Sequence, residues 1–267
     1  MGRLIKIEYL KLKKSKSMWV LLGLYLACLV LIAFSGNIIL GYLADAGVQY
    51  NGLDPTILPI YDFVDIWQNL SWLGGFFKIF PAFLIVISMC NEFQFKTHRQ
   101  NIMDGMSRLE FFLSKLSFAG FLALLSAGVL FVLGMILGLI YSPVKDIPSI
   151  FSNIYFLLGH FYELLLYFLF AMLVALIIRK TGIAIVVLLM YTWFIEPIGV
   201  AILSNWYPEW ASAFPLESIS ALVKFPFSRY ILLYSQDFIA WMDFAKATLW
   251  AFVFGGFIYY QLVKRDF

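Results

Sequence analysis

The chain alternates between long apolar runs and short polar segments. Crossing a hydrocarbon core of about 30 Å takes ~20 mostly apolar residues, and runs of that length recur along the whole sequence. We place spans at roughly Met18 to Tyr42, Ser71 to Cys90, Leu116 to Tyr141, Ile154 to Ile178, Thr181 to Leu203 and Ile239 to Val263. The pattern predicts an all-α membrane protein with six transmembrane helices, forming a single domain over residues 1–267.

The composition supports this class. Of 267 residues, 63% are hydrophobic and 13% are charged, which is about half the charged content of a soluble globular chain. Little chain remains for a soluble domain. The two cysteines, Cys28 and Cys90, both lie in apolar runs, so we expect buried thiols rather than a disulfide or a metal site.

The segments between the spans differ in charge. Of the 19 Lys and Arg residues, 14 lie in the N-terminal arm, in residues 91–115, at Arg179 and Lys180, and in the tail. The positive-inside rule makes this face cytoplasmic, with both termini on it. On the opposite face, residues 41–70 form a predicted loop that contains no Lys or Arg but several Asp residues.

Two segments do not fit either a span or a plain loop. Residues 1–17 are basic and partly amphipathic. This segment is open to two interpretations, which are an interfacial helix on the cytoplasmic surface and a plain topology signal. Residues 204–238 contain three prolines and many aromatic residues. They are too apolar for a solvated loop and too interrupted for a span, so we predict a re-entrant helical hairpin on the outer side.

Familiar catalytic motifs are absent from the sequence. None of the 18 glycines is followed by lysine, which excludes a GxxxxGK[ST] phosphate loop, and GxSxG, HExxH and paired-cysteine motifs are also missing. We therefore expect a non-enzymatic chain without its own metal, cofactor or nucleic-acid partner. If ATP drives it, another polypeptide must bind the ATP and Mg²⁺.

Four ionisable residues lie inside predicted spans: Lys78, His160, Glu163 and Glu196. A charge at membrane depth costs at least a few kcal/mol, so each is expected to face protein or water. Pro197 follows Glu196 and should bend or end the helix beside that carboxylate. Glu163 and Glu196 are open to two interpretations, which are contact with a transported substrate and structural pairing.

The most polar segment is NEFQFKTHRQNIMDGMSRLEFFLSK, from Asn91 to Lys115. As a helix from Phe93 it separates an apolar from a polar side, and Gly105 suits a break before Ser107. Its order of Glu92, Thr97, Gly105, Ser107, Arg108 and Lys115 resembles the loop between spans two and three in permeases of the type-2 ABC exporter family. The basic N-terminal segment, the six spans, the segment between spans five and six, and the tail also resemble that family.

The resemblance implies a permease subunit of an ATP-driven exporter in the bacterial cytoplasmic membrane. Two permease chains, identical or closely related, would pair, contact membrane lipid, and bind two separate ABC ATPase subunits through a coupling helix within residues 92–115. An amphipathic or lipid-linked substrate would leave the cytoplasm or membrane. The residues expected to couple to the ATPase are Glu92, Thr97, Arg99, Gln100, Asn101 and Asp104. Those expected to line the translocation path are Phe76, Phe80, Glu163, Tyr191, Phe194 and Glu196.

Other functions stay open on the sequence alone. An ATP-independent secondary transporter or channel would have paired charges in mid-membrane and dispensable cytoplasmic loops. A permease-like subunit that regulates or anchors a partner would have the same fold. A membrane-embedded hydrolase would have to rely on His160 and Glu163.

Overall fold

The computed structural model describes residues 8, 13, 15–48, 54, 56, 58–97, 100, 103, 105–227, 229 and 236–264. Within these residues the chain is helical, without β-strands, as predicted. The elements are α2 (Lys16–Asp45), α3 (Phe63–Phe76), α4 (Ile79–Gln94), α6 (Arg108–Tyr141), α7 (Ile147–Phe151), α8 (Tyr155–Ile178), α9 (Thr181–Met190), the π-helical turn η2 (Tyr191–Ile195), α10 (Glu196–Ser204), α11 (Pro208–Ala211), α12 (Pro215–Ser220) and α14 (Trp241–Lys264).

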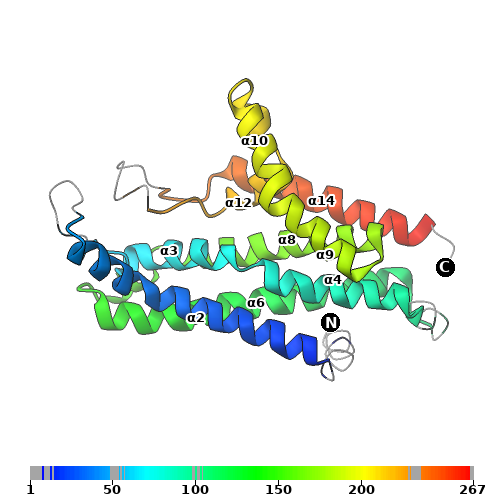
Figure 1. Ribbon diagram of the computed structural model, residues 1–267, viewed down its shortest axis with the longest axis horizontal. Helices are drawn as coiled ribbons and strands as arrows, with labels where there is room; N and C mark the ends of the chain where they lie inside the picture. The colour runs from blue at the N-terminus through cyan, green and yellow to red at the C-terminus, as the bar shows by residue number, and fades with distance from the viewer. Residues whose placement is uncertain are drawn as a thin grey trace.

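The long helices form an elongated bundle around α8. This helix contacts α3, α4, α6, α9, α12 and α14, and α2 packs on the side formed by α3, α4 and α6. The beginning of α2 and the end of α14 lie at the same end of the bundle (Figure 1). The end of α4, the beginning of α6 and the α8–α9 turn lie at that end as well, so the described helix ends next to the segments predicted to be cytoplasmic lie together.

Helices suited to a membrane are present, but fewer than predicted. In the described part of the chain, four helical segments are long and apolar enough to cross a membrane, and a fifth is added if the bent pair α3–α4 counts as one span. The helix of the sixth predicted span, α14, contains Asp243, Lys246 and Lys264 and is not among them. The fold is therefore consistent with a membrane protein of four or five such helices.

The second predicted span is longer than expected and is broken. It comprises α3 and α4, which meet at an angle of 47°, and it starts at Phe63 rather than at Ser71. Gln68 and Asn69 belong to the predicted loop over residues 41–70, yet both are buried in α3. The Asn69 amide donates to the Ile60 carbonyl and the Gln68 amide to the Lys224 carbonyl. Their polar groups are satisfied within the protein, so the helix can extend through them.

Local chemistry explains the break between α3 and α4. Pro81 lies in the first turn of α4 and cannot donate a hydrogen bond to the Phe77 carbonyl. That carbonyl instead accepts from the Phe80 N–H at 3.1 Å, and the Phe77 N–H donates to Gly74 at 3.2 Å. These i→i−3 bonds end one helix and start the next, with Lys78 between them.

Helices α3 and α6 pack closely because α6 has glycines at the contact. A Cβ atom on Gly138 would lie 2.5 Å from Cε1 of Phe63, and one on Gly134 would lie 2.7 Å from Cζ3 of Trp67. These two glycines form the GxxxG motif of the third predicted span. Here the small residues accept two buried aromatic rings from the neighbouring helix.

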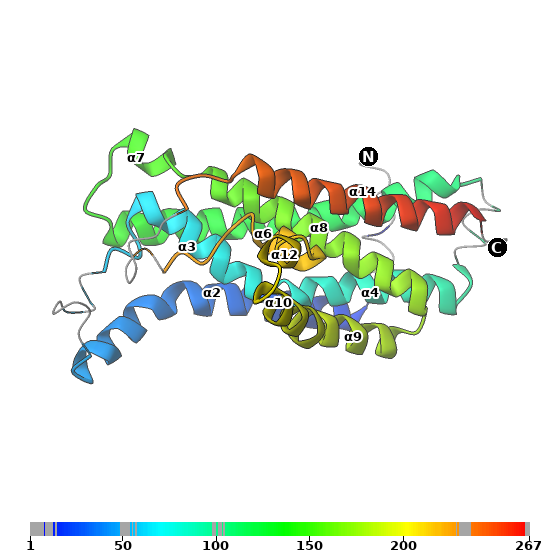
Figure 2. The ribbon, with the colours of Figure 1, turned by 90° about the horizontal axis from the view of Figure 1, so that it is seen from above.

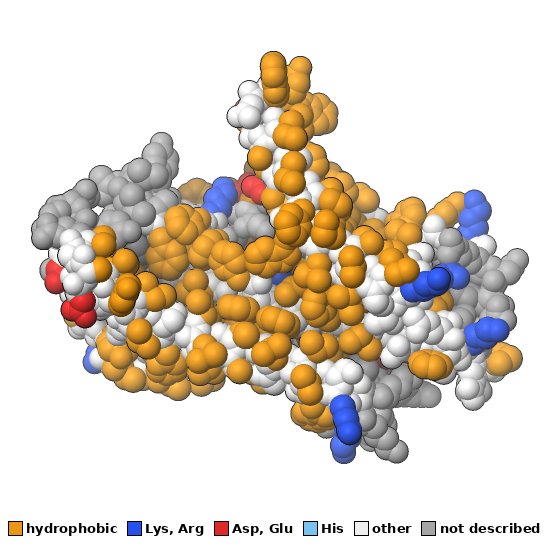
Figure 3. All heavy atoms as spheres, in the orientation of Figure 1, with side chains coloured by type: hydrophobic (Ala, Val, Ile, Leu, Met, Phe, Trp, Pro, Cys, Tyr) orange, Lys and Arg blue, Asp and Glu red, His pale blue; other side chains and the backbone are white. Residues whose placement is uncertain are grey.

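The fifth predicted span leaves the bundle. After α9 the chain passes through η2 into α10, which projects away from the other helices in Figure 1 and is seen end-on in Figure 2. The wider π turn precedes Pro197, which lacks the N–H group that an α-helix needs there. The projection is largely hydrophobic on the face shown in Figure 3, and Phe194, Ile198 and Ile202 are each more than half exposed.

The segment after α10 contains the short helices α11 and α12. Helix α12 packs against α8 and α14, and the Trp250 indole N–H of α14 donates to the Ala213 carbonyl at 2.9 Å. A re-entrant position in a membrane remains a prediction. The predicted interfacial helix over residues 1–17 lies mostly outside the described residues.

Candidate functional site

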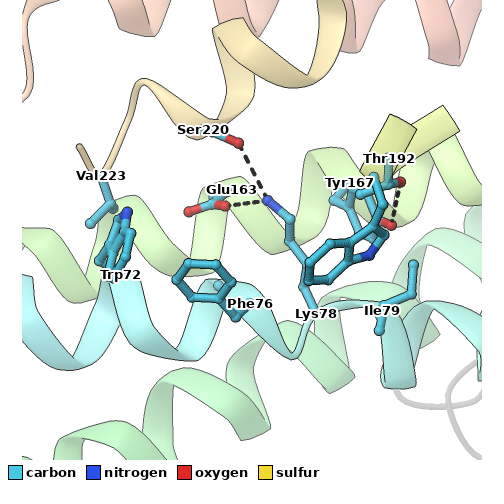
Figure 4. A pocket seen from close by; sticks show the side chains of 11 residues that line it. Trp72, Phe76, Lys78, Ile79, Glu163, Tyr167, Thr192, Ser220 and Val223 are labelled. Carbon is cyan, nitrogen blue, oxygen red and sulfur yellow. Dashed lines mark hydrogen bonds and ion pairs between the residues drawn. The ribbon is translucent and has the colours of Figure 1, made fainter. Parts of the chain in front are cut away.

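A cavity of about 250 Å³ lies beside the break between α3 and α4. Trp72, Phe76 and Lys78 line it from α3 and the break, Glu163 and Tyr167 from α8, and Thr192 and Ser220 from η2 and α12 (Figure 4). The cavity thus combines residues from four separate parts of the chain. A charged pair and three hydroxyl groups, those of Tyr167, Thr192 and Ser220, share it with aromatic rings. Binding cavities commonly combine apolar walls with a few polar groups in this way.

Lys78 and Glu163 form the charged centre of this cavity. The Lys78 ammonium lies 2.6 Å from Oε1 of Glu163 and 3.4 Å from the Ser220 hydroxyl, and it lies 5.1 Å from the centre of the Tyr167 ring. The side chains are 13% and 5% exposed, so each charge depends on the other for compensation. The cation interacts with a carboxylate, a hydroxyl and an aromatic face at once.

Two consecutive glycines allow α8 to approach the break. A Cβ atom on Gly75 would lie 3.3 Å from Oε1 of Glu163, and one on Gly74 would lie 2.9 Å from Cδ1 of Leu130. Larger side chains would push α8 or α6 away from α3. The Gly-Gly sequence therefore places the Glu163 carboxylate within reach of Lys78.

A smaller cavity of about 120 Å³ also has Lys78 in its wall. Lys78, Thr192 and Ser220 line both cavities, and Glu196 lines only the smaller one. Oε1 of Glu196 accepts a hydrogen bond of 2.7 Å from the backbone N–H of Glu217. Lys78 therefore lies next to two cavities that each contain a carboxylate, of which Glu163 is its partner in this conformation.

The π turn contacts the charged site through Thr192. The Thr192 hydroxyl is 2.9 Å from the Tyr167 hydroxyl on α8, and Tyr167 lies beside Lys78 (Figure 4). A π turn shifts the register of the residues that follow it, and such turns are frequent at functional sites. Any change in this turn would alter both the Thr192–Tyr167 contact and the position of Glu196.

His160 belongs to a different polar group from Glu163. Its Nε2 atom is 2.9 Å from the Ser126 hydroxyl of α6, which is 2.5 Å from the Tyr25 hydroxyl of α2. All three side chains are buried. They connect α2, α6 and α8 through side-chain hydrogen bonds, which is a structural arrangement and gives His160 a different partner from Glu163.

A second buried ionic cluster lies at the end of the bundle where α4 ends. The Lys115 ammonium of α6 is 2.7 Å from Oε2 of Glu8, 2.8 Å from Oε1 of Glu92 and 2.8 Å from the Ser88 hydroxyl. All four residues are at most 5% exposed. The cluster binds α4, α6 and the N-terminal segment to one another on either side of the α4–α6 connection.

The predicted path residues are divided among several places. Phe76 and Glu163 line the larger cavity, and Glu196 lines the smaller one. Phe80 packs between the rings of Phe77 and Phe83, Tyr191 packs on Phe170, and Phe194 is 55% exposed. The structure thus brings three of the six together around Lys78.

The predicted coupling residues are only partly described. Thr97 and Gln100 are exposed, whereas Glu92 is buried against Lys115. Arg99, Asn101 and Asp104 lie outside the described residues. The left-handed conformation of Gly105, with φ of 95°, agrees with the predicted break before Ser107, whose side chain caps α6 together with Glu110.

Some site residues could not be found from the sequence. Tyr167, Thr192 and Ser220 have ordinary surroundings in their apolar segments, and only the fold brings them to Lys78. Glu8 lies in a segment dominated by lysines, where a single acid gives no signal. Lys78, in contrast, could be recognised from the sequence, since a lysine inside a predicted span needs a partner.

In the part of the chain that the structure describes, no three His, Cys, Asp or Glu side chains are arranged to hold a metal ion. No protein-family model matches this chain, and no curated protein matches it.

Proposed function

We propose that this chain is the permease subunit of an ATP-driven exporter of the ABC type-2 kind, located in the bacterial cytoplasmic membrane with both termini in the cytoplasm. Separate ATPase subunits would bind ATP and Mg²⁺, and a second permease chain would complete the path. The observation that supports this proposal best is that α4 has a buried ionic cluster near one end and the Lys78–Glu163 cavity at the other.

Helix α4 is suited to transmit a displacement. Its 16 residues extend for about 24 Å, and Glu92 near its end is bound to Lys115 of α6. Pressure on the α4–α6 connection would therefore move α4 and the start of α6 together. Because α4 is bent against α3 beside Lys78, such a movement would change the position of Lys78 relative to Glu163 on α8.

The surface of η2, which connects α9 to the projecting α10, supports pairing with a second chain. Trp193, Phe194 and Ile195 of η2 are each more than half exposed, directly before the helix α10 that projects from the bundle. Contact between the η2–α10 segments of two chains would bury apolar surface that is exposed in a single chain. The polar cavity beside Lys78 would lie near this contact. The aromatic rings and the charged pair in this cavity fit an amphipathic substrate.

Copurification with an ATPase tests the proposal. The tagged chain is isolated from its native membrane in mild detergent, and bound subunits and vanadate-sensitive ATP hydrolysis are measured. We expect an ABC ATPase with the wild type and with Lys145→Glu, at the opposite end of the bundle, and at least a tenfold loss with Thr97→Arg or Gln100→Glu. Absence of an ATPase from the wild-type preparation would contradict the proposal, and so would unchanged binding by both loop variants.

An ATP-independent transporter is the second candidate, and one observation favours it. The Lys78–Glu163 pair lies at a helix break within a long apolar segment, and secondary transporters commonly bind substrates at such breaks. In vesicles without ATP, this function predicts substrate uptake that follows an imposed ion gradient and disappears in Glu163→Gln. Transport that requires ATP would exclude it.

A further inference from the structure

A separate cavity of about 280 Å³ lies between α2 and α3, away from Lys78. Its wall contains Ile32, Ile39, Leu43, Leu70 and Leu73, together with the chain before α3 and Phe227. The cavity beside Lys78 contains a charged pair. Among the described residues that line the present cavity, the only ionisable side chain is the Tyr61 phenol.

The polar atoms around this cavity already have partners. The Tyr61 hydroxyl donates to the Ala33 carbonyl at 2.6 Å, the Asn69 amide to the Ile60 carbonyl at 2.8 Å, and the Ser35 hydroxyl to the Ile32 carbonyl at 2.9 Å. An occupant would therefore contact mainly hydrocarbon. Water needs two to four polar partners to fill a cavity, and these groups are engaged with the protein itself.

The cavity is next to the outward surface of α2. Leu31, Ile38 and Tyr42 are each at least 70% exposed, and Ile39, which is 52% exposed, also belongs to the cavity wall. In a membrane this side of α2 would face the hydrocarbon chains of lipids. Ile39 thus belongs both to the cavity wall and to this apolar surface, and we expect a lipid chain to enter beside it.

We propose that this cavity binds one hydrocarbon chain of a membrane phospholipid. Its volume is roughly twice the ~150 Å³ of an apolar protein cavity that binds benzene, which gives room for about ten to twelve carbon atoms. Solvent exclusion adds nothing when the chain comes from the bilayer, so binding rests on the contacts that an empty cavity lacks. A chain is also the occupant that the membrane supplies at the highest concentration.

Phe227 marks the inner limit of this site. It lines the apolar cavity, and its ring centre lies 5.8 Å from that of Trp72, which lines the charged cavity. The two rings meet edge to face and separate the hydrocarbon site from the Lys78–Glu163 pair. The chain-binding site is thus a distinct site, and it does not depend on the proposed transport function.

Photo-crosslinking tests this proposal. The protein is reconstituted into phosphatidylcholine vesicles that contain a small fraction of phosphatidylcholine with a diazirine in one acyl chain, irradiated, digested and mapped by mass spectrometry. We expect adducts on cavity residues of segments 32–43 and 58–73. Ser35→Leu, which extends a side chain into the cavity, should reduce these adducts at least fivefold, and Leu43→Phe should act in the same way if the first variant does not fold.

Leu31→Phe is the matched control, because Leu31 lies on the exposed side of the same helix and outside the cavity wall. It should retain wild-type adducts in the cavity. Adducts confined to Leu31, Ile38 and Tyr42 would mean that lipid only surrounds the protein and would overturn the proposal. Undiminished cavity adducts in a folded filling variant would overturn it as well.

Discussion

The Lys78 ammonium and Oε1 of Glu163 lie 2.6 Å apart, although the two residues are 85 positions apart in the sequence. Lys78 stands at the break between α3 and α4, and Glu163 belongs to α8, the central helix of the bundle. Both charges are largely shielded from solvent, so the pair fixes the broken helix against the centre of the bundle.

Removing one partner of this pair should destabilise the protein more than removing both. We expect Lys78→Met or Glu163→Gln alone to lower the free energy of unfolding by about 3 kcal/mol, because the remaining charge is buried without compensation. The double variant should recover most of this loss. Unfolding of the purified protein in mixed micelles of increasing SDS content measures the difference, and additive losses in the double variant would contradict the pairing.

Glycine is required at position 138 of α6. A Cβ atom there would lie 2.5 Å from the Phe63 ring, so Gly138→Ala should lower the free energy of unfolding by about 1–3 kcal/mol through overpacking. Gly128 on the same helix has no atom within 4 Å of its Cβ position. Gly128→Ala should be neutral or stabilise by up to about 1 kcal/mol, and equal effects at the two positions in the same unfolding assay would contradict the close approach of α3.

Lys115 should hold the end of α4 and the beginning of α6 together. Lys115→Met leaves the carboxylates of Glu8 and Glu92 buried without their cation, so we expect these ends to open. Hydrogen exchange followed by mass spectrometry should show at least tenfold faster exchange in residues 88–94 and 108–115. Exchange in the middle of α8 should not change, and unaltered exchange at both helix ends would refute the role of Lys115.

The start of α7 should depend on pH through Asp146. Hydrogen bonds from the Ser149 side chain and backbone N–H lower the pKa of Asp146 below its ordinary value. The ionised carboxylate therefore stabilises this turn fully above the ordinary pKa of about 3.9, and the effect is lost as the pH falls through the lowered pKa. The NMR shift of the Ser149 amide should report this transition. Asp146→Asn should abolish it, and the same transition in the variant would assign it to another group.

Much of the fold could be predicted from apolar run length. The starts and ends of α2, α8 and the α9–α10 segment lie within a few residues of the predicted spans, because each is a nearly uninterrupted apolar run. The outer part of α3 could not be predicted in this way. Its polar residues Gln68 and Asn69 look like loop residues until the partners that satisfy them are known, and those partners are set by the tertiary fold.

The candidate site was predictable in its charges but not in its geometry. Lys78, Glu163 and Glu196 stand out as costly residues in apolar segments, and each has a partner in the structure. That Lys78 would pair with Glu163 rather than with Glu196 depends on the 47° bend and on the glycines beside it. Neither a bend angle nor a close approach between helices follows from residue spacing alone.

The length of α6 has a consequence for any soluble protein that binds nearby. At 1.5 Å per residue its 34 residues extend for about 51 Å, against a hydrocarbon thickness of about 30 Å. A tilt of about 20° would shorten this span by only a few ångströms. The first two turns of α6 would then extend beyond the hydrocarbon core, into the headgroup region and the water next to it. A soluble protein could therefore bind beside this helix end without removing water from the bilayer surface.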